Sequence, residues 1–171
     1  MSLSDPRIVD DLLNYRLDRL LAASGATIVR LCEGRYGITR REWRLIALVT
    51  AHGAMSPSAL ASRAQLERPR VSRLITELVD KTLFERVGDP TDKRRALLRL
   101  TAEGEALYAE LFPQTVAFNN RVLAALSADE LKVFAAAMTK LTEEATRLAA
   151  LKEAGVKADR RHGGARKLRR G

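Results

Sequence analysis

An arginine-rich stretch at residues 67–73 (ERPRVSR) carries the side chains in this sequence that are best suited to binding a polyanion. In a helix, Arg70 and Arg73 would lie about one turn apart on one face, with Val71 and Leu74 turned toward the protein. A guanidinium can donate paired hydrogen bonds to guanine O6 and N7 or to phosphate oxygens. An arginine-rich helix face can also be an ordinary solvated surface. The segments next to it in the sequence decide between this interpretation and a polyanion-binding face.

A second group of bases follows where the hydrophobic period changes from helical to alternating. Residues 83–87 (LFERV) and 95–101 (RALLRLT) are expected strands, joined by a turn that the Gly, Asp and Pro at 88–90 favour. A protruding loop with arginines suits the narrow, electronegative minor groove of DNA. The bases at this tip are Lys93, Arg94 and Arg95.

Two short helices should position the arginine-rich stretch. Ser56 is a candidate N-cap and Pro57 suits the first helical position of a helix over 57–64. After a turn at 65–67, the apolar spacing predicts a further helix over 68–81. This is the helix-turn-helix arrangement, in which the first residues of the second helix meet base edges in the major groove.

Helical periodicity continues on both sides of this region. A helix is expected from about Asp5 to Cys32, followed by a turn up to Gly37, and Gly25 within it indicates either a close helix contact or a cavity. Capping boxes are expected at Thr39 with Glu42 and at Ser127 with Glu130, and Thr101 is expected to cap a helix over 102–126.

The last helix has an apolar seam with steps of three and four residues. Such a seam packs against another helix, which is either the preceding helix of the same chain or a helix of a second chain. Its residues are Leu131, Phe134, Met138, Leu141, Ala145 and Leu148.

Composition and charge agree with a mainly helical, basic protein. Of 171 residues, 46% are hydrophobic and only 5% aromatic, and the net charge is +9. Residues 156–171 hold seven bases and one acid, so most of the net charge lies in a tail expected to be disordered. No apolar run is long enough to cross a bilayer and no signal peptide is evident, so we expect a cytoplasmic, nucleoid-associated protein that does not bind membranes.

Other chemistry is poorly supported by the sequence. The single cysteine, Cys32, excludes an internal disulfide, and with two histidines there is no set with metal-ligand spacing. We find no phosphate-binding glycine loop or catalytic motif, so we expect neither an enzyme nor a cofactor or metal.

Residues 36–104 resemble the MarR family of bacterial winged-helix transcription regulators, and the flanking helices extend the resemblance to about 8–150. The wing signature is its most specific part. The residues that carry the resemblance are Tyr36–Gly37–Ile38–Thr39, Trp43, Leu60–Ala61, Val71–Ser72–Arg73, Asp92, Arg94, Leu98, Leu100–Thr101 and Gly104.

The resemblance implies a winged helix-turn-helix lobe at 36–101 with a small β-hairpin wing. It also implies a helical dimerisation region formed by 1–35 and 102–154, with the tail 155–171 outside both. In this arrangement Arg94 reaches the minor groove and Asp92 holds the wing tip. One departure is Thr82, which stands after the recognition helix where the family usually has Gly. Because Gly tolerates positive φ there, we expect either some strain at Thr82 or a different exit of the chain from the helix.

Two residue sets follow from these expectations. The DNA-binding set is Ser56, Ser58, Arg68, Pro69, Arg70, Ser72, Arg73, Asp92, Lys93, Arg94 and Arg95. The family commonly binds a small anionic or phenolic ligand between its two regions, and an arginine beside an aromatic ring suits an aromatic or heteroaromatic carboxylate. The effector-binding set is Tyr15, Arg16, Arg19, Arg40 and Trp43.

The sequence therefore predicts a homodimeric, ligand-responsive repressor that binds a pseudo-palindromic site in double-stranded DNA and releases it on binding an aromatic acid. Two alternatives stay open. The chain could be an architectural DNA-binding protein without an effector, or a redox-sensing regulator that acts through Cys32.

Overall fold

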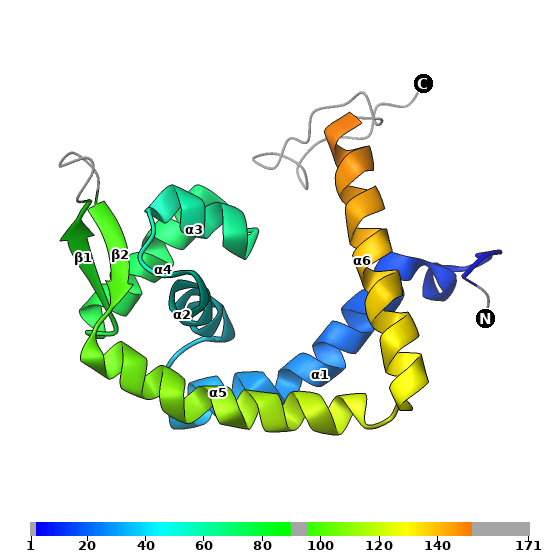
Figure 1. Cartoon of the computed structure of the whole chain (residues 1–171), viewed down its shortest axis with the longest axis horizontal. Coiled ribbons are helices and arrows are strands. Elements are labelled where there is room, and N and C mark those ends of the chain that lie inside the picture. Colours follow the sequence, from blue (N-terminus) through cyan, green and yellow to red (C-terminus); the bar gives the residue numbers. More distant parts are fainter. Residues whose placement is uncertain (1–2, 90–95, 152–171) are drawn as a thin grey trace, which may run out of the picture. The chain divides into compact units, whose positions relative to one another are not determined.

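The computed structural model describes residues 3–89 and 96–151, and the chain divides into two compact units, Met1–Val122 and Leu123–Gly171. Within the described residues there are six α-helices and one two-stranded antiparallel sheet (Figure 1). The mainly helical winged helix-turn-helix fold predicted from the sequence is confirmed. Among the described residues, no helix is both long and apolar enough to span a membrane.

The elements follow one another with short connections. Their bounds are a 3-10 turn at Val9–Asp11, α1 at Leu13–Arg35, α2 at Arg40–His52, α3 at Pro57–Ala64, α4 at Arg68–Asp80, β1 at Phe84–Gly88, β2 at Ala96–Leu100, α5 at Ala102–Leu123 and α6 at Ala128–Leu151.

The hydrophobic core of the first unit lies where α2, α3, α4 and the hairpin meet. Ile46, Leu60, Leu78 and Leu98 supply it from these four places, and each is fully buried. Burying a side chain of this size contributes about 1.5–3 kcal/mol. The helix-turn-helix is therefore held as a rigid lobe by its own core.

The hairpin pairs Phe84 with Leu100 and Gly88 with Ala96 in a regular antiparallel register. Met55, just before α3, forms an isolated bridge with Leu98: the N–H of Met55 donates to the carbonyl of Leu98 at 3.2 Å, and the reverse bond is 2.8 Å. These bonds attach the wing to the start of the helix-turn-helix.

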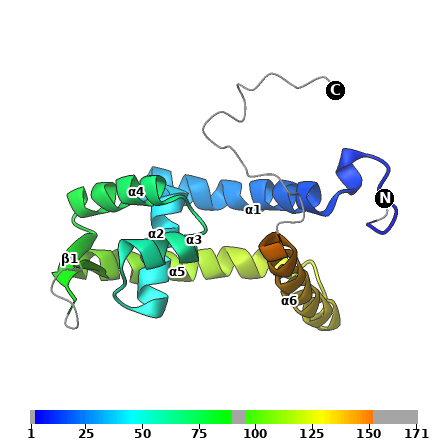
Figure 2. The same cartoon turned by 90° about the horizontal axis from the view of Figure 1, so that it is seen from above.

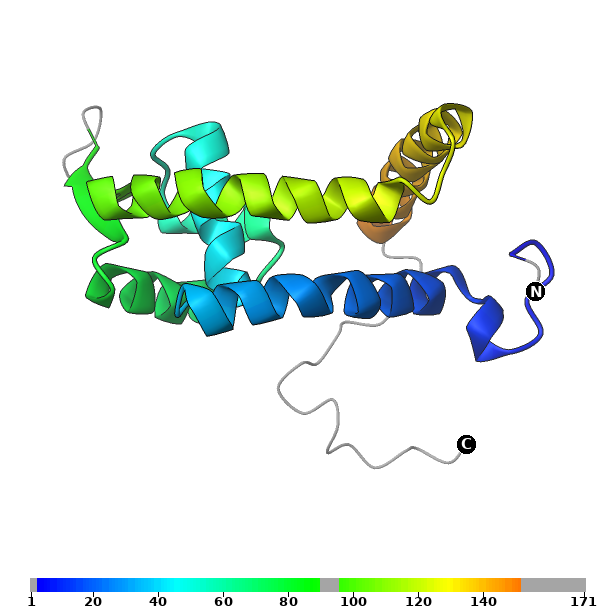
Figure 3. The same cartoon turned by 90° about the horizontal axis from the view of Figure 1, so that it is seen from below.

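The long helices α1 and α5 run in opposite directions on the two sides of α2 (Figures 2 and 3). They meet where α1 ends: the guanidinium of Arg35 lies 2.9 Å from a carboxylate oxygen of Glu110 on α5, which also accepts a 2.9 Å bond from the hydroxyl of Tyr36. Deeper in, the ring of Trp43 on α2 stacks on Tyr108 of α5 with centroids 5.5 Å apart.

The first long helix differs from the prediction at both ends. It begins at Leu13 rather than near Asp5, because the carboxylate of Asp11 accepts the backbone N–H groups of Arg7 at 3.1 Å and Ile8 at 3.4 Å and folds the chain into a separate 3-10 turn. It ends at Arg35, so Cys32 lies in the last helical turns and not in a connecting turn.

The predicted caps are confirmed. The N–H of Glu42 donates to the hydroxyl of Thr39 at 3.2 Å, and the N–H of Thr39 donates to the Glu42 carboxylate at 2.6 Å. Ser127 and Glu130 form the same reciprocal pair at the start of α6. The hydroxyl of Thr101 accepts the N–H of residue 104 at 3.1 Å, although the helix that it caps ends at Leu123, earlier than predicted.

Thr82 adopts the left-handed conformation, with φ of 57°, directly after α4. Its N–H donates to the carbonyl of Val79, and the N–H of Leu83 donates to that of Leu78, both at 2.9 Å. These two bonds close the C-terminus of α4 and place the positive φ on a β-branched residue, so of the two outcomes expected for the absent glycine the structure shows the strained one.

The second unit is dominated by α6, in which no residue is buried. On its apolar seam the side chains of Phe134, Met138 and Leu141 are 41%, 36% and 46% exposed. The seam predicted from the sequence is thus present as an open apolar stripe.

Candidate nucleic-acid interface

The arginine-rich stretch forms the first turns of α4. Gln65 ends α3 in the left-handed conformation, with φ of 54°, and this turn redirects the chain so that α4 can start at Arg68. Pro69 lies in the first turn, where the lack of an N–H costs no helical hydrogen bond.

One face of α4 is buried and the other is open. Val71, Leu74, Ile75 and Leu78 are buried in the core. All five predicted DNA-binding residues of this helix are exposed on the opposite side, namely Arg68, Pro69, Arg70, Ser72 and Arg73. In the described part of the chain, no carboxylate forms an ion pair with any of these three arginines.

Ser56 and Ser58 have separate roles. The half-buried hydroxyl of Ser56 accepts the N–H of Ala59 at 3.3 Å, which caps α3, and it lies 3.0 Å from the hydroxyl of Ser58. Ser58 is exposed in the first turn of α3 and is the freer of the two to meet a phosphate.

The hairpin extends the same lobe (Figure 1). Glu85 and Arg99 are directly opposite in the register, and their side chains form an ion pair at 2.7 Å, so neither is a free charge. Arg86 on β1 is exposed. The predicted tip residues Asp92, Lys93, Arg94 and Arg95 lie outside the described residues.

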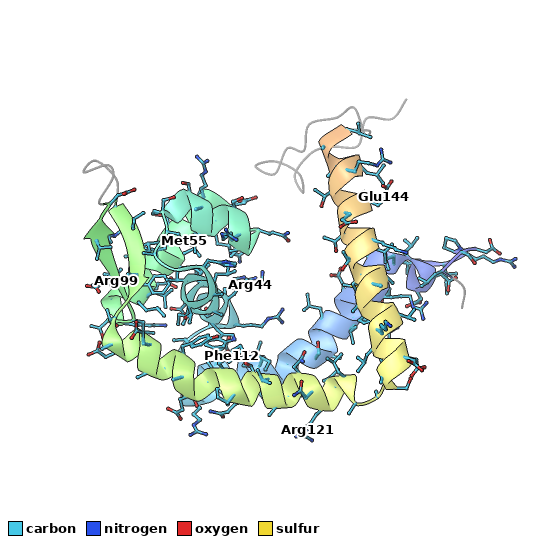
Figure 4. The ribbon with its side chains drawn as sticks, in the orientation of Figure 1. Arg44, Met55, Arg99, Phe112, Arg121 and Glu144 are labelled. Atoms are coloured by element: carbon cyan, nitrogen blue, oxygen red, sulfur yellow. The ribbon has the colours of Figure 1, made fainter. Side chains whose placement is uncertain are left out.

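Further cations on α2 and α3 were not singled out from the sequence. Arg41, Arg44 and Arg63 are exposed, and the guanidinium of Arg44 donates a 3.4 Å bond to the carbonyl of Ala64 at the end of α3. Figure 4 labels Arg44 on α2. The sequence did carry a signal for the cations of α2: in the segment RREWR at 40–44, the arginines flank Trp43 within about one helical turn.

The five predicted effector-binding residues do not come together within one chain. Arg40 lies against Gly25 of α1, and Tyr15 is ten residues earlier, about 15 Å along that helix. Arg19 pairs with Asp10 at 3.3 Å. Arg16, like Tyr15, is exposed on the N-terminal half of α1.

Trp43 is a core residue. Its side chain is only 8% exposed, and its ring is the first of a stack that continues through Tyr108 to Phe112, with centroids 5.0 Å apart in the second pair. An indole committed to this stack joins α2 to α5 and offers little surface to a ligand.

Cys32 is fully buried. Loss of solvation raises the pKa of its thiol to about 11; the nearby Glu33 adds to the rise and Arg40 opposes it. Because oxidants attack the thiolate, this environment disfavours redox sensing through Cys32. No group of His, Cys, Asp and Glu in the described ranges could hold a metal ion.

Known proteins resemble this chain in sequence and in fold. The regulator FarR of Neisseria gonorrhoeae is 38% identical over 74 residues, which are 43% of this chain and about half, 51%, of FarR. The homoprotocatechuate degradative operon repressor of Escherichia coli is 27% identical over 110 residues, 64% of this chain and 72% of that protein. The crystal structure of NadR in complex with 4-hydroxyphenylacetate matches with a TM-score of 0.68 and 26% identity, over 80% of this chain and 99% of NadR.

The sequence profile of the MarR family matches residues 36–95, which contain the helix-turn-helix and the first strand of the hairpin. By their names, FarR and the homoprotocatechuate degradative operon repressor are regulators of transcription and not enzymes. With the fold and the exposed recognition helix, this match confirms the resemblance carried by the sequence motifs. Over residues 36–95, the chain therefore resembles the MarR family of winged-helix regulators in sequence and in fold.

Proposed function

We propose that this chain regulates transcription in the cytoplasm by binding double-stranded DNA with α4 in the major groove. The observation that carries the proposal is the outer face of α4, where Arg68, Arg70 and Arg73 are exposed and have no carboxylate partner among the described residues. The hairpin would then reach the adjacent minor groove through Arg94, with Asp92 holding the tip.

The test measures binding to DNA selected from a pool of random duplexes by the wild-type protein. If Arg70 and Arg73 read bases, Arg70→Gln and Arg73→Gln should each weaken binding by about 1–3 kcal/mol and relax the sequence preference. If they contact phosphate, the loss of affinity should be the same for all DNA sequences. Arg121→Gln removes the same charge from α5 and serves as the matched control. If the α4 variants bind as the control does, the interface is refuted.

We further propose that the protein acts as a homodimer formed by residues 1–35 and 102–154, with 36–101 as the DNA-binding lobe. The open apolar seam of α6 supports this, because exposed side chains such as Phe134 and Leu141 gain about 25 cal/mol per Å² when covered. Two α4 helices would then enter major grooves about 34–36 Å apart on a pseudo-palindromic site. Light scattering should give twice the chain mass, and Leu141→Glu should reduce it.

The effector proposed is an aromatic acid that releases DNA, which would make the protein a repressor. The support comes from proteins similar to this chain: the structure of NadR was solved in complex with 4-hydroxyphenylacetate, and the Escherichia coli relative is named as the repressor of a homoprotocatechuate degradative operon. The candidate contacts are Tyr15, Arg16, Arg19 and Arg40; because they lie far apart within one chain, such a ligand would need residues from both chains of the proposed dimer. At 100 times its Kd, 4-hydroxyphenylacetate would stabilise the protein by about 2.7 kcal/mol. A screen of aromatic acids that yields no thermal shift would exclude this class.

The second candidate function is an architectural DNA-binding protein without an effector. DNA-binding titrations also distinguish this role from that of a regulator. Comparing the selected site with a scrambled duplex at fixed salt should show a large preference for a regulator. Equal affinities would favour the architectural role, with the basic residues 156–171 supplying charge.

A further inference from the structure

The recognition helix α4 is attached to the rest of its lobe at its C-terminal end. Lys81 is the C-cap of this helix. Its ammonium lies 2.7 Å from the carboxylate of Glu42 on α2 and donates a 3.0 Å bond to the carbonyl of Gly37, in the loop between α1 and α2. One side chain thus holds the end of α4 to two other segments of the chain.

The carboxylate that receives Lys81 is itself fixed in place. Glu42 is fully buried, and its other oxygen accepts the N–H of Thr39 at 2.6 Å. In return, the N–H of Glu42 donates to the hydroxyl of Thr39 at 3.2 Å. Because this reciprocal pair caps α2, the acceptor of Lys81 cannot move without disturbing the first turn of that helix.

The loop that supplies the second acceptor is bonded to both long helices. The N–H of Ile38 donates to the carbonyl of Cys32 at 3.1 Å, which folds the loop back over the end of α1. The hydroxyl of Tyr36 and the guanidinium of Arg35 each lie 2.9 Å from a carboxylate oxygen of Glu110 on α5. The loop is therefore a fixed point on the scaffold formed by α1 and α5.

The start of α2 also packs directly on α1. A Cβ at Gly25 would overlap the guanidinium of Arg40, so the absence of a side chain at this position lets the first residue of α2 lie against α1. This close contact, and not a cavity, explains the glycine that interrupts the helical pattern of α1. Glu42 thus belongs to a helical turn that is packed as well as capped.

Stability alone does not account for a buried carboxylate at this position. Removing a carboxylate from water is costly, and well-packed apolar side chains often stabilise a protein interior as much as a buried ion pair does. Hydrogen bonds differ from apolar contacts because they are directional. The bond between Glu42 and Lys81 therefore fixes the direction of α4 relative to α2, which the apolar face of α4 alone would leave less well defined.

The residues that face DNA in the proposed function lie at the opposite end of α4. Arg70 precedes Lys81 by 11 residues, which is about 16 Å along a helix. A tilt of about 5° at Lys81 would displace Arg70 by about 1.4 Å, whereas hydrogen-bond distances span only about 0.5 Å. Bases are read through such bonds, while attraction to phosphate depends mainly on charge. A change in the attachment would therefore impair base reading and spare the attraction to phosphate.

We propose that Lys81 is a positioning residue for sequence recognition. Together with Glu42 and the carbonyl of Gly37, it sets the angle at which α4 enters the major groove. It acts through the orientation of Arg70 and Arg73 and not by contact with DNA. This inference rests on the proposed function and adds to it a determinant of specificity at the end of α4 farthest from the bases.

The test compares affinity for the selected duplex with affinity for a scrambled duplex at one salt concentration, using full-length variants whose folding is verified by circular dichroism. In Lys81→Met, affinity for the selected duplex should fall at least about tenfold, while affinity for the scrambled duplex should stay within about twofold of the wild type. Lys81→Arg keeps a charged donor for Glu42 and should retain most of the sequence preference.

Two further variants separate positioning from a loss of stability. Glu42→Gln/Lys81→Met removes the directional bond without leaving a buried charge, so it should be more stable than Lys81→Met and still lack the sequence preference. Val49→Ala truncates a buried side chain of α2 about two turns beyond Glu42. It should lower stability and keep the wild-type ratio of the two affinities.

The outcomes assign failure to one proposal or the other. A wild-type affinity ratio in Lys81→Met, or a double variant in which preference returns together with stability, overturns the positioning role and leaves the proposed function intact. An equal loss of affinity for both duplexes would show that Lys81 contacts phosphate, and it overturns the positioning role as well. A wild type that does not distinguish the two duplexes overturns the proposed regulator, and the positioning role with it.

Discussion

Replacing Lys81 by Met should destabilise the DNA-binding lobe by about 2–3 kcal/mol. Lys81 follows α4, and its ammonium lies 2.7 Å from the Glu42 carboxylate of α2 and 3.0 Å from the carbonyl of Gly37. Removing one partner of a buried ion pair costs about 3–5 kcal/mol because the other charge is left buried. The Lys81 side chain is 39% exposed, whereas Glu42 is fully buried. Because water reaches the lysine side of the pair, the expected loss of stability lies at or below the lower end of that 3–5 kcal/mol range, about 2–3 kcal/mol.

The free energy of unfolding is measured with urea at a fixed protein concentration, followed by far-UV circular dichroism and the fluorescence of Trp43, the single tryptophan. For a chain of this length the midpoint of thermal unfolding should fall by about 5–10 °C. Lys132→Met, at an exposed position of α6, is the matched control and should stay within about 0.5 kcal/mol of the wild type.

The double variant Glu42→Gln/Lys81→Met isolates the cause. The Gln oxygen still accepts the N–H of Thr39, but no uncompensated charge remains, so at least half of the loss should be recovered. A Lys81→Met protein as stable as its control, or a double variant as unstable as the single one, would refute the account given for this pair.

Three other perturbations test the fold. Thr82→Gly relieves the positive φ and should stabilise the protein by about 1 kcal/mol in urea denaturation, whereas Thr76→Gly within α4 should destabilise it by about 0.3–0.5 kcal/mol through its lower helix propensity. Gly104→Ala places a methyl group against the carbonyl oxygen of Leu83, a backbone atom that cannot move aside, and a thermal midpoint equal to the wild type would contradict that contact. For Cys32, the unfolded thiol ionises near 9.0 and the folded one near a pKa of about 11, so its contribution to stability is complete below pH 9 and is lost between pH 9 and 11. The stability difference between wild type and Cys32→Ala should shrink over that range, and a constant difference would show that burial does not perturb the thiol.

Local signals in the sequence predicted the elements that now carry the candidate interface. The caps at Thr39 and Ser56 depend on hydrogen bonds within three residues, and the apolar period of α4 directly determines which of its faces is buried. The positive φ at Thr82 was also predictable, because a helix terminus of that type needs it whichever residue is present. Interactions over a few residues leave a pattern that can be read without the fold.

The errors and omissions involve contacts between distant segments. Trp43 stacks on a residue far along the chain, so nothing near it distinguishes a core ring from a ligand-binding one. Asp11 folds the chain before α1 by accepting backbone N–H groups, a geometry that the apolar period does not encode. The ion pair of Glu42 with Lys81 likewise depends on the packing of α2 against α4.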